Sequence, residues 1–179
     1  VAPPGGSLAS FEAVANLPWA LNLAQGWQSD VRLERIDVDR LRPDGTANLA
    51  DDPDAEVLYR FLSPSRLQEF ERQADLDRHA DADYGIWIAV GKGKAWAQLN
   101  YGRPSHDETV PPFPQAQPLT RTLPAALQRA RGAGVPFWEG YLFYTRNDGW
   151  EWYFSSLSHR DSLPRVRASD SALWPWRAR

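Results

Sequence analysis

The chain has 179 residues, of which 42% are hydrophobic and 12% aromatic, and its formal net charge at pH 7 is −3. This composition excludes a disordered chain, and no apolar run approaches the roughly 18 residues of a membrane span. The absence of cysteine excludes a disulfide framework, a thiolate metal site and a cysteine nucleophile. The arginines are scattered rather than clustered, which argues against a nucleic-acid surface. The length fits one compact domain or two small modules that share a core.

The chain begins with a short segment rich in proline and glycine, VAPPGGS, and contains no methionine. Such a start is typical of a protein whose signal peptide or lipid-anchored leader has been removed, although a cloning boundary looks the same. The basic residues are eighteen arginines and two lysines, which together with abundant alanine and proline indicates a GC-rich bacterial genome. We therefore expect an exported bacterial protein that is periplasmic, envelope-anchored or secreted.

The first predicted regular element is an amphipathic helix over 17–26, with the sequence LPWALNLAQG. Its apolar residues recur with helical spacing at Leu17, Ala20, Leu21 and Ala24. Asn16 is the candidate N-cap, Pro18 lies in the first turn, and Gly26 lies at the C-terminal end. A second helical stretch is expected over 10–15, joined or kinked at Pro18.

Two antiparallel strands are predicted next, over 31–38 and 55–62, and a long acidic segment connects them. A break containing proline and serine and then a charged stretch follow. The clearest hairpin in the chain pairs 84–90 with 94–100 across a turn at Lys92 and Gly93.

The two-residue alternation of this hairpin separates its side chains onto two faces. The core face is expected to carry Ile86, Ile88, Val90, Ala95, Ala97 and Leu99. The opposite face is expected to carry Trp87 and Trp96, near Gln98, so that the tryptophan face needs a cover of its own.

The segment 123–132, LPAALQRARG, repeats the first helix at a constant offset, with six of ten residues identical. A tight turn is predicted at 147–149, and the strands that follow the helix are predicted over 137–144, 150–155, 165–168 and 172–176. A helix followed by four strands therefore occurs twice. We predict an α+β fold of two tandem helix-plus-four-stranded antiparallel sheet repeats, 8–102 and 120–176, joined by a proline-rich linker over 103–119.

This organisation resembles PepSY-like and cystatin-like modules, and the tandem arrangement looks like that of the β-lactamase inhibitory proteins. The features that carry the resemblance are the Leu-x-x-Ala-Leu-x-x-Ala helix, the Asn-Asp-Gly turn at 147–149 and the final strand with its turn over 165–172. The resemblance implies a mostly non-catalytic module of a kind that in several cases inhibits or restrains an enzyme. The chain lacks the disulfides of the inhibitory proteins and has a long loop at 39–54, and no functional residue of these families is carried over to it.

The aromatic strand residues are the first candidate site. Alternation places Trp150, Trp152 and Phe154 on one face of their strand. If they share an exposed sheet face with Trp87 and Trp96, the five residues form a patch suited to a protein partner, because tryptophan and tyrosine dominate interface hot spots. The alternative is that the two halves pack these aromatic side chains against each other as ordinary core.

The remaining candidate sites are acidic or contain histidine, and each also fits an ordinary surface loop. Six carboxylates crowd the first long connection and suit Ca²⁺, although without EF-hand spacing: Asp37, Asp39, Asp44, Asp51, Asp52 and Asp54. The segment 75–83 alternates acids with His79. His106 directly precedes Asp107 and His159 lies two residues before Asp161, but residues so close in a chain rarely face each other.

These observations predict a non-enzymatic exported binding module without a cofactor or metal, whose partner is a protein or peptide and whose oligomeric state is left open. An upstream lipid anchor is compatible with this prediction. The alternative is a small enzyme or small-molecule carrier in a cystatin-like cone, with a pocket around a histidine or aspartate. A third interpretation is an envelope assembly component. A deep pocket that contains His106, His159 or a buried aspartate would favour the enzyme, and a flat or concave aromatic surface would favour the binding module.

Overall fold

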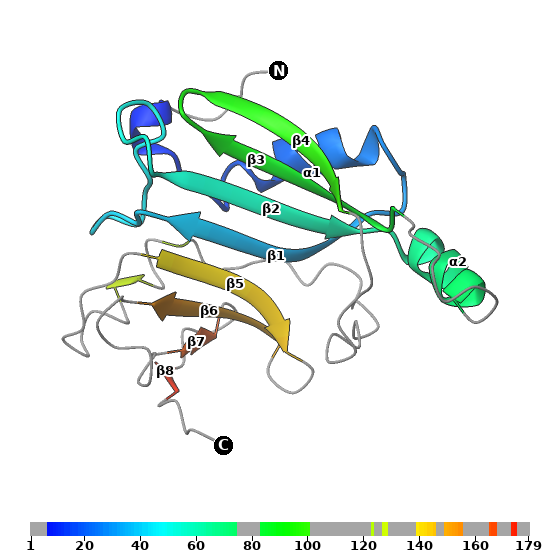
Figure 1. Ribbon diagram of the computed structural model, residues 1–179. Coiled ribbons are helices and arrows are strands. Elements are labelled where there is room, and N and C mark those ends of the chain that lie inside the picture. Colours follow the sequence, from blue (N-terminus) through cyan, green and yellow to red (C-terminus); the bar gives the residue numbers. More distant parts are fainter. Residues whose placement is uncertain are drawn as a thin grey trace.

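The computed structural model describes residues 7–74, 83–100, 123, 127–128, 139–145, 149–155, 165–167 and 173–174. They form an α+β structure in which helix α1 (Leu17–Gln25) packs on an antiparallel sheet of eight strands (Figure 1). The strands are β1 Arg32–Asp39, β2 Glu56–Leu62, β3 Gly85–Gly91, β4 Lys94–Asn100, β5 Glu139–Thr145, β6 Gly149–Ser155, β7 Arg165–Arg167 and β8 Leu173–Trp174. The helices are the 3₁₀ turn η1 Leu8–Ser10, α1 Leu17–Gln25 and α2 Pro64–Ala74.

The order of the strands in the sheet is β4-β3-β2-β1-β5-β6-β7-β8. Each strand pairs with the one before it in the chain, except that β5 pairs with β1 instead of β4. The sheet is therefore symmetric in its strand order about the β1–β5 pair, and the two halves of the chain share one continuous ladder of hydrogen bonds. The predicted linker over 103–119 lies outside the described residues.

The strands predicted in both halves of the chain are confirmed to within a few residues. The hairpin of β3 and β4 also has the predicted register, with Ile88 opposite Ala97 and Trp87 opposite Gln98. Its turn has positive φ at both central residues, 50° at Lys92 and 71° at Gly93. Positive φ at both positions is the backbone of a type I′ turn, which matches the twist of the two strands.

Two local predictions around the first helix are wrong. Apart from Ser10, which ends η1, the stretch 10–15 is not helical, because Phe11 forms an isolated bridge with Ala47 that inserts its side chain into the core. The side chain of Asn16 does not cap α1, since its Nδ2 atom instead donates to the carbonyl oxygen of Glu12 at 2.8 Å. Proline in the first turn of α1 is confirmed.

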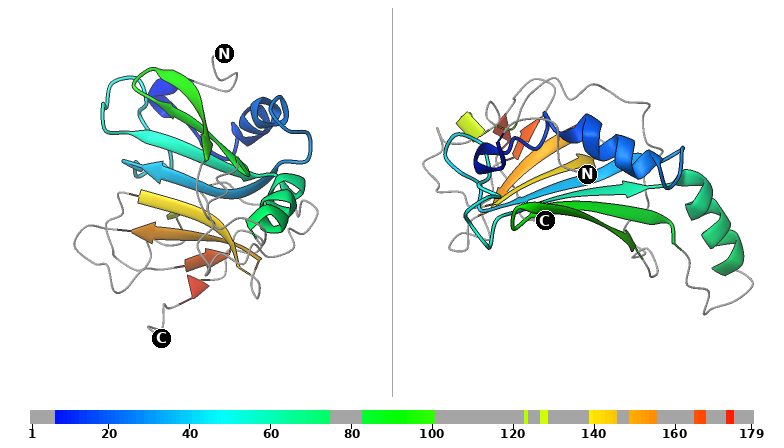
Figure 2. Two further views of the ribbon diagram at one scale, coloured as in Figure 1. Left: turned by 45° about the vertical axis from the view of Figure 1, so that its right-hand side comes forward. Right: turned by 90° about the horizontal axis from the view of Figure 1, so that it is seen from above.

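Helix α2 occupies the proline–serine break and part of the charged stretch between β2 and β3, where no helix was predicted. Ser63 caps it, because its Oγ accepts a hydrogen bond from the backbone N–H of Arg66 at 3.2 Å. The same hydroxyl donates to Asp30 at 2.6 Å, which ties the helix start to the chain before β1. Serine followed by proline is a common helix start, so this signal was present in the sequence and was missed. Figure 2 shows that α2 projects from the strand ends away from α1.

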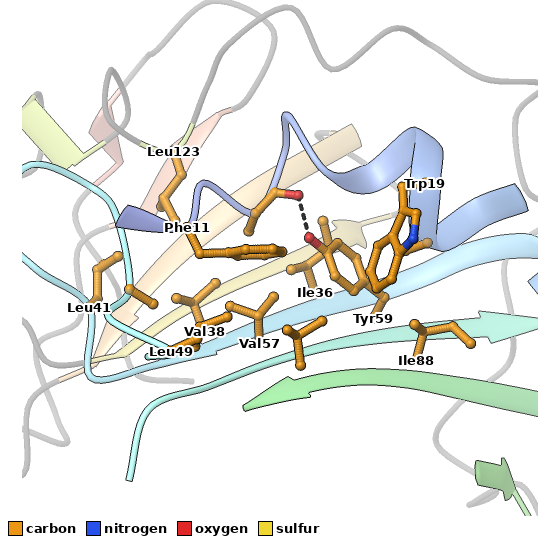
Figure 3. Packing of buried hydrophobic residues seen from close by; sticks show 14 of the residues in the cluster. Phe11, Trp19, Ile36, Val38, Leu41, Leu49, Val57, Tyr59, Ile88 and Leu123 are labelled. Carbon is orange, nitrogen blue, oxygen red and sulfur yellow. Dashed lines mark hydrogen bonds between the residues drawn. The ribbon is translucent and has the colours of Figure 1, made fainter. Parts of the chain in front are cut away.

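The hydrophobic core lies between α1 and the sheet, on one face of the sheet (Figure 3). Leu123, Leu127 and Gln128 are helical, and both leucines are buried in the same core as α1. Trp152 and Phe154 of β6 belong to this core as well. One core therefore joins the two halves of the chain.

Tyr59 is the polar group at the centre of this core. Its hydroxyl donates a hydrogen bond of 2.7 Å to the backbone carbonyl of Ala13, which fastens the segment before α1 to the middle of β2 (Figure 3). Burial, together with the nearby charge of Glu12, raises the pKa of Tyr59 well above its ordinary value. The phenol therefore stays protonated and keeps its role as a donor.

Candidate functional site

The sheet face opposite α1 carries a row of charged and aromatic side chains. We call this face of β1–β4 the distal face and define it by Arg35, Asp37, Arg60, Trp87 and Trp96. The strand register places Arg35 opposite Arg60, and Arg60 opposite Trp87. Because side chains alternate along a strand, the apolar residues between these positions point toward α1.

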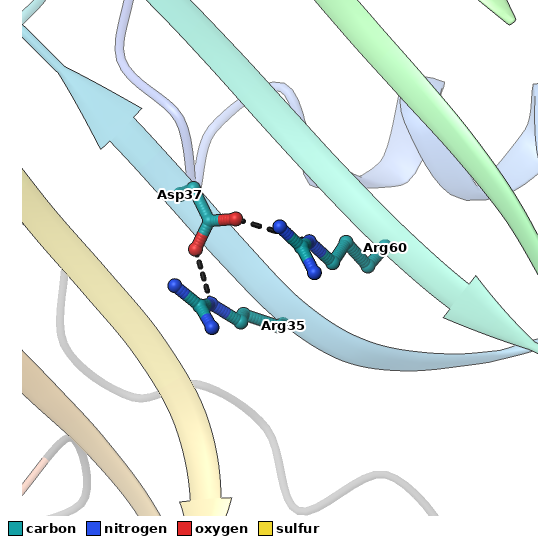
Figure 4. Close-up of polar contacts among 3 residues, drawn as sticks. All are labelled: Arg35, Asp37 and Arg60. Carbon is teal, nitrogen blue, oxygen red and sulfur yellow. Dashed lines mark hydrogen bonds and ion pairs between the residues drawn. The ribbon is translucent and has the colours of Figure 1, made fainter. Parts of the chain in front are cut away.

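Asp37 lies between two arginines at the centre of this face (Figure 4). The side chain of Arg35 forms an ion pair and a hydrogen bond with one carboxylate oxygen, and Arg60 Nε lies 3.1 Å from the other. The contact with Arg60 is an ion pair without the alignment of a good hydrogen bond. Asp37 is only 7% exposed. A carboxylate this buried needs such partners, because an unpaired charge at this depth is costly.

Burial raises the pKa of Asp37 above its ordinary value, and the positive charges of Arg35 and Arg60 oppose this shift only in part. The carboxyl group therefore gives up its proton less readily than an exposed aspartate. The pair of arginines compensates its charge when it is ionised, so the three residues act as one unit.

Arg60 also covers the ring of Trp87. Its guanidinium carbon lies 4.8 Å from the ring centroid, which is a cation–π contact. The indole Nε1 of Trp87 is buried and has no hydrogen-bond partner among the described residues. Arg60 is thus held on one side by Asp37 and on the other by Trp87, so the guanidinium has a fixed position on the distal face.

Trp96 is the large apolar side chain that the described part of the chain leaves most accessible, with 38% of its surface exposed. It lies on β4 opposite Ala89, and Gly91 is the next residue of β3 on the same face. A Cβ atom at Gly91 would lie 3.5 Å from Cη2 of Trp96. Because Ala89 and Gly91 are small, the indole ring lies against the strand instead of standing away from it.

The structure separates four of the five residues that the sequence suggested as one aromatic surface. Trp87 and Trp96 lie on the distal face, whereas Trp152 and Phe154 are fully buried in the core. The prediction is wrong for these two residues, because the register places Trp152 opposite Leu142, on the side of the sheet that faces α1. The side chain of Trp150 lies outside the described part of the chain.

The side chains of the acidic connection form local hydrogen bonds within their loop. Asp44 accepts from both the N–H and the hydroxyl of Thr46, and the hydroxyl contact lowers the pKa of Asp44. Asp54 forms an ion pair with Arg40 at 3.1 Å, while Asp37 belongs to β1 and not to the loop. Within the described segments no three acidic or histidine side chains are grouped as metal ligands would be.

The three histidines, His79, His106 and His159, lie outside the described residues, so the structure does not test an acid–base role for them.

An apolar cleft lies between α1 and the β3–β4 hairpin and has a volume of about 220 Å³. It is lined by Leu23, Ile88, Ala95, Trp96 and Ala97. None of these residues is titratable, so this cleft offers apolar contact and no proton-transfer group.

Sequence reasoning missed the unit formed by Arg35, Asp37 and Arg60. It assigned Asp37 to the acidic connection, although the alternation of Ile36 and Val38 with Arg35 and Asp37 already indicated a charged strand face. The pairing with Arg60 depends on the register between β1 and β2, which one-residue shifts would alter.

Comparison of the chain with protein-family models, with curated proteins and with solved structures gives no match. The resemblance to PepSY-like and cystatin-like modules therefore stays a prediction from the residues. The helices in the described segments are too short or too polar to span a membrane.

Proposed function

We propose that the protein is a non-enzymatic binding module that engages a protein or peptide partner through the distal face. The observation that supports this function is the exposed ring of Trp96 on the same face as the stacked pair of Arg60 and Trp87. Tryptophan and arginine are the side chains most enriched at interface hot spots.

The side chain of Arg60 is already ordered by its neighbours, so it loses little conformational entropy when a partner binds. Arg60 contacts Asp37 and Trp87 already in the unbound chain. A partner that packs on this face would therefore meet a surface that is already arranged, which lowers the cost of association. The ring of Trp96 supplies apolar area beside it.

We further propose that 8–102 and 120–176 are tandem repeats of a PepSY-like or cystatin-like unit, exported by a bacterium. The strand order, which is symmetric about the β1–β5 pair, supports a duplication. So does the burial of Leu123 and Leu127 in the same core as α1. Helix α2 would then be an insertion that the first unit carries between β2 and β3. Inhibition of an enzyme is one form that binding through this face would take.

The experiment is affinity capture from the native bacterium with the full chain as bait, compared with the variant Trp96→Ala. We expect the specific partner to be lost from the variant, because the exposed ring is removed while the core is unchanged. Gln98→Ala is the matched control, since Gln98 lies exposed on the same strand and the same face. Equal recovery of the partner by Trp96→Ala and by the unchanged protein would refute the role of this face.

A further inference from the structure

Strand β4 forms an edge of the sheet. In the described sheet it pairs with β3 alone. In a two-residue hairpin the residues that close the turn bond to each other, and the direction of bonding then alternates along the strand. Gly91 and Lys94 close this turn. The N–H and C=O groups of Ala95, Ala97 and Leu99 therefore point away from the sheet.

Within the segments that the structure describes, these outward-pointing N–H and C=O groups have no hydrogen-bond partner. Natural edge strands are commonly protected by a proline, a bulge or an inward-pointing charge. From Ala95 to Leu99 the strand has none of these and pairs with β3 in regular register. An extended segment can thus hydrogen-bond along this edge without any rearrangement of β4.

The apolar cleft between α1 and the hairpin lies beside the same edge. Its walls include Leu23 of α1 and both Ala95 and Ala97 of β4. A strand added to β4 would point every second side chain toward α1, and the residue opposite Ala97 would face the cleft. The volume of about 220 Å³ exceeds that of an engineered apolar cavity of ~150 Å³ that holds benzene. The cleft is large enough for one aliphatic or aromatic side chain.

The charge at one end of the edge indicates the chemistry of the occupant. Lys92 and Lys94 are the two lysines of the chain, and both are exposed. Neither forms an ion pair with a described residue. An antiparallel strand would place its C-terminal end beside Lys94, where an acidic group would be favoured. A second copy of this chain, paired about Ala97, would place Asn100 there and leave both lysines without an anion.

We propose that β4 binds an extended segment of a partner protein as a ninth, antiparallel strand. The segment places a large apolar side chain opposite Ala97 in the cleft and an acidic residue beside Lys94. This inference rests on the proposed function in that the partner is a protein or peptide, and it adds the strand edge as a second surface next to the distal face. Main-chain hydrogen bonds supply affinity, and the cleft and the lysines supply specificity.

The probe is the blocked peptide acetyl-TVTLTVE-amide, whose leucine lies opposite Ala97 when its glutamate lies beside Lys94. Binding to the full chain is measured by fluorescence anisotropy of the labelled peptide at low and high salt. We expect saturable binding that weakens as salt rises, because the lysine contact is exposed. The same peptide with N-methyl groups on its leucine and on both valines cannot donate to Ala95, Ala97 or Leu99, and we expect it to bind at least ~10-fold more weakly.

Two protein variants test the same arrangement. Ala97→Pro removes an outward N–H from an edge position where proline is tolerated, and we expect it to abolish peptide binding, whereas the control Gln98→Ala binds as the unchanged protein does. Lys94→Glu should weaken binding by about 2–5-fold, and a peptide that ends in lysine instead of glutamate should recover the loss.

Equal binding of the plain and the N-methylated peptides, or no binding of the plain peptide at millimolar concentration, would overturn the proposal. Because the N-methylated peptide acts on the unchanged protein, this result does not depend on the folding of Ala97→Pro. The proposal would also be overturned if the protein self-associates, if Ala97→Pro abolishes this self-association, and if the peptide does not compete with it. The edge would then bind a second copy of the chain. If Trp96→Ala no longer captures the natural partner but Ala97→Pro still does, the role of the edge is refuted and the proposed function is left intact.

Discussion

The two faces of β1–β3 are built from alternate residues of the same strands, yet they are stabilised in different ways. The face toward α1 is filled by apolar side chains such as Ile36, and Tyr59 satisfies its hydroxyl within the core. The distal face instead holds a buried carboxylate between two arginines. The comparison shows that the covered face should respond to changes in side-chain volume, and the distal face to changes in charge.

The largest expected effect is the loss of volume on the covered face. Trp152→Ala removes a side chain with no exposed surface, and we expect the free energy of unfolding to fall by about 3–5 kcal/mol. Urea denaturation followed by circular dichroism measures this change. Trp96→Ala is the control on the distal face, where the exposed ring should cost less than about 1 kcal/mol. Similar losses for both variants would contradict the difference between the faces.

A smaller loss is expected when the distal face loses a charge. Arg60→Ala leaves Asp37 with Arg35 as its remaining ion partner among the described residues and uncovers the ring of Trp87. Because Arg60 is 30% exposed, we expect a cost of about 1–3 kcal/mol, less than for a fully buried pair. Arg66→Ala, on the exposed surface of α2, should change stability by less than about 0.5 kcal/mol. An equal effect of both arginines would show that the contact with Asp37 contributes nothing.

Gly91 of β3 lies close both to the backbone of Ala55 and Glu56 and to the ring of Trp96. A Cβ atom there would lie 3.1 Å from the carbonyl oxygen of Ala55, which is a backbone atom and cannot move easily. We expect Gly91→Ala to cost about 1–2 kcal/mol and to change the exposure of the Trp96 ring to acrylamide quenching. Ala89→Gly is a second variant on the same face, which should alter the quenching without the clash. Unchanged stability in Gly91→Ala would show that β2 and β3 separate freely at this point.

The smallest effect is a difference in pH dependence between two aspartates. Asp37 has a raised pKa, so the folded state binds its proton more tightly than the unfolded chain does. Its contribution is present below the ordinary value of 3.8 and is lost as the pH rises through the folded pKa. As the pH rises through the folded pKa of Asp37, the stability of the unchanged protein should therefore fall relative to that of Asp37→Asn.

Asp44 has a lowered pKa and should show the opposite trend. Its contribution is present above 3.8 and is lost as the pH falls through the folded pKa. Urea midpoints of Asp37→Asn and Asp44→Asn, each compared with the unchanged protein between pH 3 and 7, measure both trends. The same direction of change for the two variants would contradict this assignment of the shifts.

Local patterns in the sequence predicted most of the elements but not the whole candidate site. The alternation of β3 and β4 and the Lys92–Gly93 turn were sufficient for the hairpin and for the placement of Trp87 and Trp96 on one face. Helix α2 was missed because its apolar residues are few, although Ser63 and Pro64 form a recognisable start. The stretch 10–15 was mistaken for helix because the bridge of Phe11 to Ala47 depends on a residue 36 positions away.

The sequence by itself determined which residues share a face of each strand, because side chains alternate with a period of two whatever the strand pairs with. The apolar pattern also indicated the core face of β3 and β4, but only the tertiary structure decided that Trp152 and Phe154 are core. It also brought Arg60 to Asp37, and it left β4 at an edge by pairing β5 with β1. Strand order and register depend on contacts between distant segments, which no local pattern encodes.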